Sequence, residues 1–330
     1  CDFGDAAAIA EDEAADLAEE RLALGHAGTR DDPIPRELAV PIGSGFRLAI
    51  TGYEPNAAET IEATNGYTPF LDEDEHVARV SYQIAYDGSD EPIDAYDVNV
   101  TAFESAGVEL DTNACNFPGE PRFNDKLFAG ATASYSSCIT GRPDQLGDPV
   151  VGVRVGFGDD LVYFDPTDVA TAPTTIEATP LDPDGELAAG RAAASPPGTP
   201  VDLGEGWTVT VESATLDGTA EVLAHSDSND APIDGFAYSL VSVTMTYDGD
   251  EPASPSFVIL QLVGDDAISR SPDCSFSSIP DELDTFAELL PGTTVKGTYC
   301  FTTPTNQHDS TVLYARGGFF SDNDEFFALR

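Results

Sequence analysis

The chain has 330 residues, of which 60 are Asp or Glu and only 14 are Lys or Arg, so its net charge is -46. A surface this acidic repels nucleic acid and anionic lipid headgroups, which excludes both as direct binding partners. Such acidity is typical of high-salt organisms and of high-GC organisms that use little Lys, so a haloarchaeal and an actinobacterial source both remain open. The longest apolar run, residues 257–263, is far shorter than the roughly twenty residues that span a bilayer, so we expect no transmembrane helix.

The first residue is Cys1, and residues 1–40 are rich in acidic residues and flexible in composition. This arrangement predicts a processed lipoprotein whose N-terminal cysteine carries a diacylglyceryl lipid. A two-chain lipid is an effectively permanent anchor, so we expect the protein on the extracytoplasmic face of the cell membrane. There are two alternatives: Cys1 carries a free thiol, or the sequence begins at this residue arbitrarily.

Residues 1–40 are therefore expected to form a lipid-anchored tether with a possible helix. Within residues 5–24 the apolar side chains recur on one face at helical spacing, and the acids fall largely elsewhere. Two interpretations stay open: a marginal helix that frays in water, or a helix that docks onto a partner beside the membrane. Three prolines then predict a stiff, extended approach to the first domain: Pro33, Pro35 and Pro41.

An internal repeat predicts the domain organisation. The run Val80–Gly88 returns 161 residues later as Val241–Gly249, and each run ends in Tyr-Asp-Gly. Other landmarks keep this offset within two residues: Gly45-Phe46 with Gly206-Trp207, Cys115 with Cys274, Lys126–Gly130 with Glu288–Gly292, Cys138 with Cys300, and Phe164 with Phe326. We expect two copies of one domain, at 41–165 and 204–330, joined by a Pro/Ala-rich linker at 166–203 that includes a possible short helix at 187–194.

Each copy alternates large apolar with small or polar residues, as Phe46–Ile50 and Trp207–Val211 show. A period of two is typical of strands with one buried face. Several short strands at intervals of roughly ten residues predict an all-β fold of two tandem β-sandwiches. Each copy is large enough to bury its own core.

The remaining four cysteines fall as one pair in each copy. Pairing within the copies gives two disulfides, and each closed loop would stabilise its domain by roughly 3 kcal/mol in the chain-entropy model. This predicts an oxidising, extracytoplasmic compartment. The spacing fits no metal site, since the chain has no CxxC motif. The predicted pairs are Cys115 with Cys138 and Cys274 with Cys300.

The second copy resembles a known family in three stretches: Trp207–Val211, Tyr238–Tyr247 and Leu289–Phe301. They are similar to the telokin-like domains of prokaryotic secreted proteins, typified by the mycobacterial secreted immunoprotective antigen. The resemblance implies immunoglobulin-like sandwiches outside the cytoplasm and transfers no catalytic residue. The first copy departs from the pattern: Ala129–Ser134 lacks the proline and the second glycine, and Ile139 follows Cys138 where the family has Phe.

No catalytic motif accompanies this architecture. The sequence contains no GxSxG, HExxH, GxGxxG after a strand or P-loop, so we expect no enzyme and no cofactor. Four histidines lie in polar surroundings and are expected at the surface: His26, His76, His225 and His308.

Acidic loops raise the alternative of calcium, because Ca²⁺ takes clustered oxygen ligands. The loops at 72–75, 227–230 and 321–325 supply such oxygens, but none has the spaced order of an EF-hand, so we predict no metal site. The sequon Asn99-Val-Thr101 lies inside a predicted strand and is a weak glycosylation acceptor.

The predicted function is that of a membrane-anchored, non-enzymatic lipoprotein whose two domains bind protein. A lipid, a tether and two rigid domains would hold a partner near the bilayer at high effective concentration. We therefore expect an accessory subunit on the outer face of an integral membrane complex, respiratory or transport. The alternatives are a solute-capturing lipoprotein and a structural cell-envelope protein. Four aromatics near the C-terminus form either an interface or, as we favour, the last core strand: Phe319, Phe320, Phe326 and Phe327.

Overall fold

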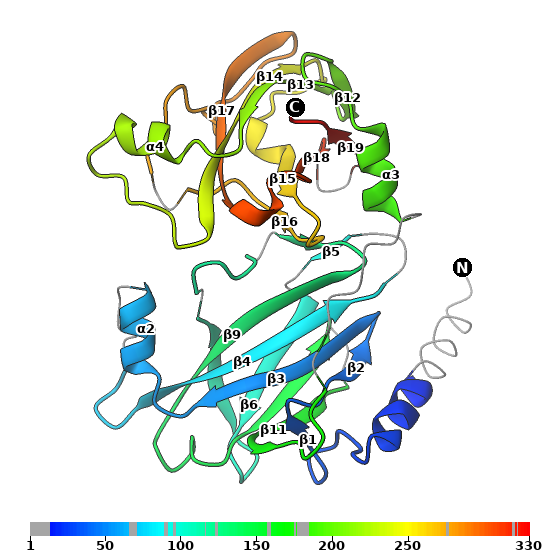
Figure 1. The fold of residues 1–330 in the computed structure, drawn as a ribbon, viewed down its shortest axis with the longest axis vertical. Coiled ribbons are helices and arrows are strands. Elements are labelled where there is room, and N and C mark those ends of the chain that lie inside the picture. The colour runs from blue at the N-terminus through cyan, green and yellow to red at the C-terminus, as the bar shows by residue number, and fades with distance from the viewer. Residues whose placement is uncertain are drawn as a thin grey trace. The chain divides into compact units, whose positions relative to one another are not determined.

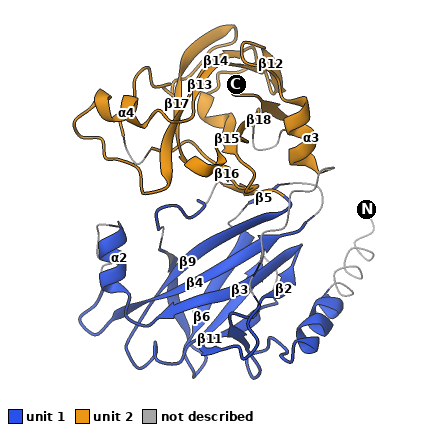
Figure 2. Cartoon of the chain, viewed as in Figure 1, with its two compact units in different colours: residues 1–123, 129–180 blue, residues 124–128, 181–330 orange. Residues whose placement is uncertain are grey.

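Strands dominate the fold, in agreement with the all-β prediction (Figure 1). The chain divides into two compact units (Figure 2). Unit 1 comprises residues 1–123 and 129–180, and unit 2 comprises residues 124–128 and 181–330. The computed structural model describes residues 14–65, 71–88, 92–94, 97–115, 117–122, 125–156, 160–174, 176, 185–274, 277–318, 321 and 323–330.

Unit 1 is built around one nine-stranded sheet in the order β1-β11-β10-β6-β7-β9-β4-β3-β2. All its neighbouring strands are antiparallel except β1 and β11, which run parallel. Its elements are β1 (Ile34–Arg36), β2 (Val40–Gly43), β3 (Phe46–Glu54), α2 (Ala58–Asn65), β4 (His76–Tyr86), β5 (Ile93–Asp94), β6 (Val98–Phe103), β7 (Glu109–Ala114), β9 (Ala131–Gly141), β10 (Val150–Val155) and β11 (Val162–Val169).

Unit 2 has two four-stranded sheets, β12-β13-β14-β17 and β16-β15-β18-β19. Buried residues of both sheets share one apolar cluster around Trp207 and Phe301, so the sheets form a sandwich. Its elements are β8 (Lys126–Leu127), α3 (Glu186–Ala193), β12 (Val201–Gly204), β13 (Trp207–Thr215), α4 (Thr219–His225), β14 (Phe236–Tyr247), η2 (Pro255–Phe257), β15 (Ile259–Val263), β16 (Ser269–Arg270), β17 (Thr293–Pro304), η3 (Thr305–Gln307), β18 (Val312–Arg316) and β19 (Asp324–Phe327).

The two units share their strand order. The run β2-β3-β4-β9 of unit 1 corresponds to β12-β13-β14-β17, and β11-β10-β6-β7 corresponds to β19-β18-β15-β16. The bulge at Ile50/Gly52 in β3 has its counterpart 161 residues later, at Val211/Ser213 in β13. Local backbone irregularities therefore recur at equivalent positions in the two units.

The repeated Tyr-Asp-Gly motif closes an equivalent corner in each unit. The Asp87 N–H donates to the Gly45 carbonyl at 2.8 Å, and the Asp248 N–H donates to the Gly206 carbonyl at 2.8 Å. Both glycines have positive φ, and a Cβ on Gly206 would lie 2.4 Å from the backbone nitrogen of Gly249. Only glycine tolerates this combination of backbone angle and close approach.

The single sheet of unit 1 differs from the two separate sheets expected for an immunoglobulin-like sandwich. Strand β7 is the cause, because it pairs with β6 at Glu109 and Leu110 and then with β9 over Asp111–Ala114. It thereby joins the two halves of the sheet. The equivalent β16 has two residues and pairs only with β15 among the named strands of the described chain.

The described part of the predicted tether contains a helix held on unit 1, and its residues 34–36 form β1 of the nine-stranded sheet. Residues 14–23 are helical. Arg21 Nη1 donates to the Pro41 carbonyl at 3.1 Å, and Arg47 pairs with Glu20 at 2.6 Å. These contacts hold the helix against the hairpin of β2 and β3. Cys1, the predicted lipidation site, lies outside the described residues.

Helix α3 lies within the segment expected to link the two domains, where the sequence predicts a short helix. It buries Leu187, and Gly190 lies so close to the ring of Phe326 that a Cβ would be 2.3 Å from it. None of the helices in the described ranges is long and apolar enough to cross a membrane.

Candidate binding surface

The structure contains both disulfides that the sequence predicts. They join Cys115 to Cys138 and Cys274 to Cys300, with Cα–Cα distances of 5.2 and 5.8 Å. Disulfides persist in oxidising compartments, so they indicate an extracellular location.

A short segment inside the first disulfide loop belongs to unit 2. We call residues 125–128 the docking segment; it lies along the edge strand β16, with an isolated bridge from Leu127 to Ile268. Three hydrogen bonds fix it there: the Phe128 N–H to the Ala267 carbonyl at 2.9 Å, the Lys126 N–H to Ser269 Oγ at 2.6 Å, and the Ser271 N–H to Asp125 Oδ1 at 2.8 Å. The segment therefore covers a strand edge that would otherwise present unpaired backbone groups.

The side chains of the docking segment enter the apolar interior of unit 2. Leu127 is buried, and Phe128 is only 2% exposed. The Phe128 ring packs edge-on against Tyr314 at 5.6 Å between centroids and lies 6.3 Å from the ring of Phe326. Aromatic pairs at such distances add to the energy of apolar burial.

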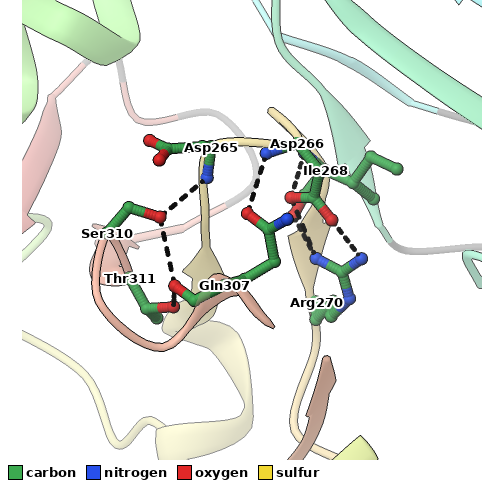
Figure 3. A network of polar contacts seen from close by, with 7 residues as sticks. All are labelled: Asp265, Asp266, Ile268, Arg270, Gln307, Ser310 and Thr311. Carbon is green, nitrogen blue, oxygen red and sulfur yellow. Dashed lines mark hydrogen bonds and ion pairs between the residues drawn. The ribbon is translucent and has the colours of Figure 1, made fainter. Parts of the chain in front are cut away.

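A polar network holds the turn in front of β16 (Figure 3). The Asp266 carboxylate accepts from the Ile268 N–H at 3.3 Å and forms an ion pair with Arg270. Further bonds tie this turn to the loop before β18: the Asp266 N–H donates to Gln307 Oε1, the Asp265 N–H donates to Ser310 Oγ, and Thr311 Oγ1 donates to the Gln307 carbonyl. These bonds hold the turn in front of the edge that receives the docking segment.

Unit 2 has its own counterpart of the docking segment, and this counterpart is only partly buried. Residues 287–290 follow the docking segment by 162 positions, and Leu289 is buried as Leu127 is. Leu290, the counterpart of Phe128, is 60% exposed, and the nearby Phe286 is 85% exposed.

A third exposed apolar side chain comes from the adjoining segment. The Ser256 N–H donates to the Thr285 carbonyl at 2.8 Å, which brings Phe257, 53% exposed, beside the segment that carries Phe286. We call Phe257, Phe286 and Leu290 the apolar patch. A hydrophobic group of this kind with polar borders is typical of an interaction site.

The borders of the apolar patch are acidic. Asp284 and Glu288 lie on either side of Phe286 in the sequence and are exposed, as are Asp250 and Glu251 beyond the adjoining segment. No Lys or Arg occurs between Ser271 and Val295. The local field therefore favours a positively charged partner surface.

Unit 1 has a partly buried polar cluster beside its disulfide. Ser136 Oγ donates to Glu120 Oε1 at 2.8 Å, and the Arg79 guanidinium lies 4.0 Å from the Glu120 carboxylate and 3.9 Å above the Phe117 ring. Burial raises the pKa of Glu120, and the hydrogen bonds from Ser136 and the charge of Arg79 oppose this effect. The residues satisfy one another, so we interpret the cluster as structural.

The histidines are separate from one another. His76 and His225 are exposed. His26 pairs with Asp32 at 3.3 Å, and His308 bonds Thr303 Oγ1 at 3.2 Å, with its pKa lowered by burial.

The acidic loops make local contacts. In the loop at 227–230, Asn229 Nδ2 donates to the carbonyls of Val222 and Ser278, and in the last loop Asp324 pairs with Arg316. Within the described ranges, no three His, Cys, Asp or Glu side chains are grouped to hold a metal ion.

The C-terminal aromatics belong to the core where they are described. Phe326 and Phe327 are buried in unit 2, which confirms the favoured interpretation for these two. Phe319 and Phe320 lie outside the described residues. The sequence analysis did not predict the apolar patch. The match of Lys126–Gly130 with Glu288–Gly292 could have pointed to it, because it aligns the docking segment with the exposed stretch.

No family model matches the chain, and no curated protein matches it. Solved structures similar to part of it are mainly β-sandwich proteins. They include the yjhA protein of Bacillus subtilis, with 17% identity over 41% of this chain and 99% of that chain and a TM-score of 0.29. An uncharacterised β-sandwich protein of Clostridium difficile has 11% identity over 42% and 95% and a TM-score of 0.28, and a candidate lipoprotein of Bacillus subtilis, ycdA, has 13% identity over 38% and 37% and a TM-score of 0.27. Likenesses at this level carry no argument about activity or partner, and the telokin-like assignment stays a prediction.

Proposed function

We propose that the protein is a non-catalytic, extracytoplasmic binding module, anchored to the cell membrane through a lipid on Cys1 and built from two telokin-like, immunoglobulin-like domains. Its partner is an integral membrane complex, on whose outer face it serves as an accessory subunit. The observation that supports this function is the apolar patch, because Phe286 is 85% exposed and Phe257 is 53% exposed. Exposed aromatics of this kind commonly anchor protein–protein contacts.

Location and geometry support the same function. The two disulfides fit an extracellular setting. The helix at residues 14–23 is fixed to unit 1 by Arg21 and Glu20, so a lipid on the preceding chain would hold unit 1 close to the bilayer. Tethering of this kind raises the effective concentration of a binding module next to membrane proteins.

The test is to purify the natively processed protein from a mild-detergent extract of the membranes of its own organism. Mass spectrometry would then identify both the co-purifying proteins and the mass of the Cys1 peptide. We expect a stoichiometric set of integral membrane proteins and a lipid mass on Cys1. The matched control is the Cys1→Ser variant, which should leave the membrane fraction and lose the set.

Two results would contradict the proposal. A lipidated protein recovered alone would favour solute capture or an envelope role in place of an accessory subunit. A Cys1 peptide without lipid would remove the anchor.

A further inference from the structure

We propose that the apolar patch is the docking site for a partner protein that presents an apolar surface bordered by Lys and Arg. This inference rests on the proposed function and names the surface and the chemistry of the partner. Its basis is the docking segment, which shows how the equivalent stretch of unit 1 is used.

The first step is the equivalence of the two stretches. Leu127 and Leu289 are both buried and both form an isolated strand bridge, to Ile268 and to Ala253 respectively. The next residue differs, since Phe128 is 2% exposed and Leu290 is 60% exposed. One stretch thus has an apolar surface to dock on, and the other presents the corresponding side chain to solvent together with Phe257 and Phe286.

The second step argues against a second copy of this chain as the occupant. In each copy the edge of β16 already receives the docking segment, and the equivalent β7 already pairs with β9 over Asp111–Ala114. The acidic borders of the patch would also face another chain of net charge -46. Like charges brought together at an interface oppose association.

The third step sets the charge of the partner. Four exposed acids, Asp250, Glu251, Asp284 and Glu288, lie within seven residues of a patch residue in the sequence, and no Lys or Arg lies between Ser271 and Val295. A lipid surface with anionic headgroups is repelled by this border. A protein surface with an apolar centre and Lys or Arg at its rim complements both the patch and its border.

The experiment uses the full-length, natively processed chain with the photocrosslinker benzoylphenylalanine in place of Phe286. The matched control carries the same crosslinker in place of Val108, an exposed residue of unit 1. We expect a product at position 286 whose partner peptide has apolar residues flanked by Lys or Arg, and no such product at position 108. Leu290→Ser should lower the yield of the crosslinked product at position 286 at least about tenfold, as loss of an apolar anchor does. The double variant Asp284→Lys, Glu288→Lys should also lower this yield. Trp207 fluorescence would confirm that each variant is folded.

Several results would overturn the inference. These are a product with a second copy of this chain, with phospholipid or with an acidic peptide, no product at position 286, equal yields at positions 286 and 108, or a yield that Leu290→Ser leaves unchanged. If membrane proteins still co-purify with a Phe286→Ser and Leu290→Ser variant as they do with the wild type, the binding function stands and this docking site is wrong. If nothing co-purifies with the wild type, the proposed function itself fails.

Discussion

The docking segment at residues 125–128 and its counterpart at residues 287–290 occupy equivalent places in the repeat but have opposite surroundings. Phe128 is enclosed by Tyr314 and Phe326, whereas Leu290 faces solvent. The difference arises from what lies opposite each stretch. Residues 125–128 lie along β16 and bring the Phe128 ring against Tyr314 and Phe326. Residues 287–290 pair with Ala253 through Leu289 and leave Leu290 uncovered. Segments at equivalent places in the two units can therefore differ in their contacts and exposure, and the proposed docking site uses the exposed one.

The largest expected effect tests whether the docking segment is part of the core of unit 2. Phe128→Ala should lower the free energy of unfolding of unit 2 by about 3–5 kcal/mol, because it leaves a cavity against Tyr314 and Phe326. The fluorescence of Trp207, the single tryptophan, reports this unfolding, since its side chain is buried in the core of unit 2. The midpoint in urea should fall although the substitution lies in the first half of the chain. An unchanged Trp207 transition would show that residues 125–128 are dispensable to unit 2.

A second prediction concerns the corner that both units share. Gly206 and Gly198 both have a φ of 82°, but a Cβ on Gly198 would meet no atom within 4 Å, whereas one on Gly206 would meet Gly249 at 2.4 Å. Gly198→Ala should therefore cost only the backbone strain, about 1–2 kcal/mol. Gly206→Ala should cost clearly more, because the backbone of Gly249 must move as well. Trp207 fluorescence during urea unfolding measures both.

Equal costs for these two variants would contradict the importance of the close approach. Gly45→Ala in unit 1 extends the comparison, because a Cβ there would lie 2.7 Å from Gly88. Its effect should appear as faster hydrogen exchange in β3 and β4 and should leave the Trp207 transition unchanged.

A third prediction separates the units by pH. Burial raises the pKa of Glu120 above its ordinary value of 4.5, so the folded state binds this proton more tightly than the unfolded chain does. The stability from this carboxyl is fully present below the unfolded pKa and is lost as the pH rises through the folded pKa. Glu120→Gln should therefore gain stability relative to the wild type as the pH increases across this window. Hydrogen exchange of amides in β4 and β9 measures the difference. A difference between wild type and Glu120→Gln that is constant with pH would show that burial does not control the ionisation of Glu120.

Local features of this fold could be predicted from the sequence. The repeat makes Gly45-Phe46 and Gly206-Trp207 recognisable as equivalent positions, and one cysteine pair in each copy predicts both disulfides. The single sheet of unit 1 could not be predicted, because it depends on whether β7 continues far enough to reach β9. The burial of the docking segment also depends on residues far away in the sequence, because Lys126-Leu-Phe and Glu288-Leu-Leu have the same pattern of polarity. Only the strand edge at Ala267–Ser271 decides which of them is buried.

The smallest expected effect is also the most informative about the apolar patch. Leu290→Ala should change the free energy of unfolding of unit 2 by no more than about 0.5 kcal/mol, as is usual for an exposed side chain. Leu290 is at the position equivalent to Phe128. Phe128→Ala and Leu290→Ala therefore compare a buried and an exposed side chain at equivalent positions, and Trp207 fluorescence measures both. A loss comparable to that of Phe128→Ala would mean that Leu290 is covered in solution by the protein itself, and the patch would then be unavailable to a partner. A near-zero effect on stability, combined with lower recovery of membrane proteins, would assign Leu290 to recognition.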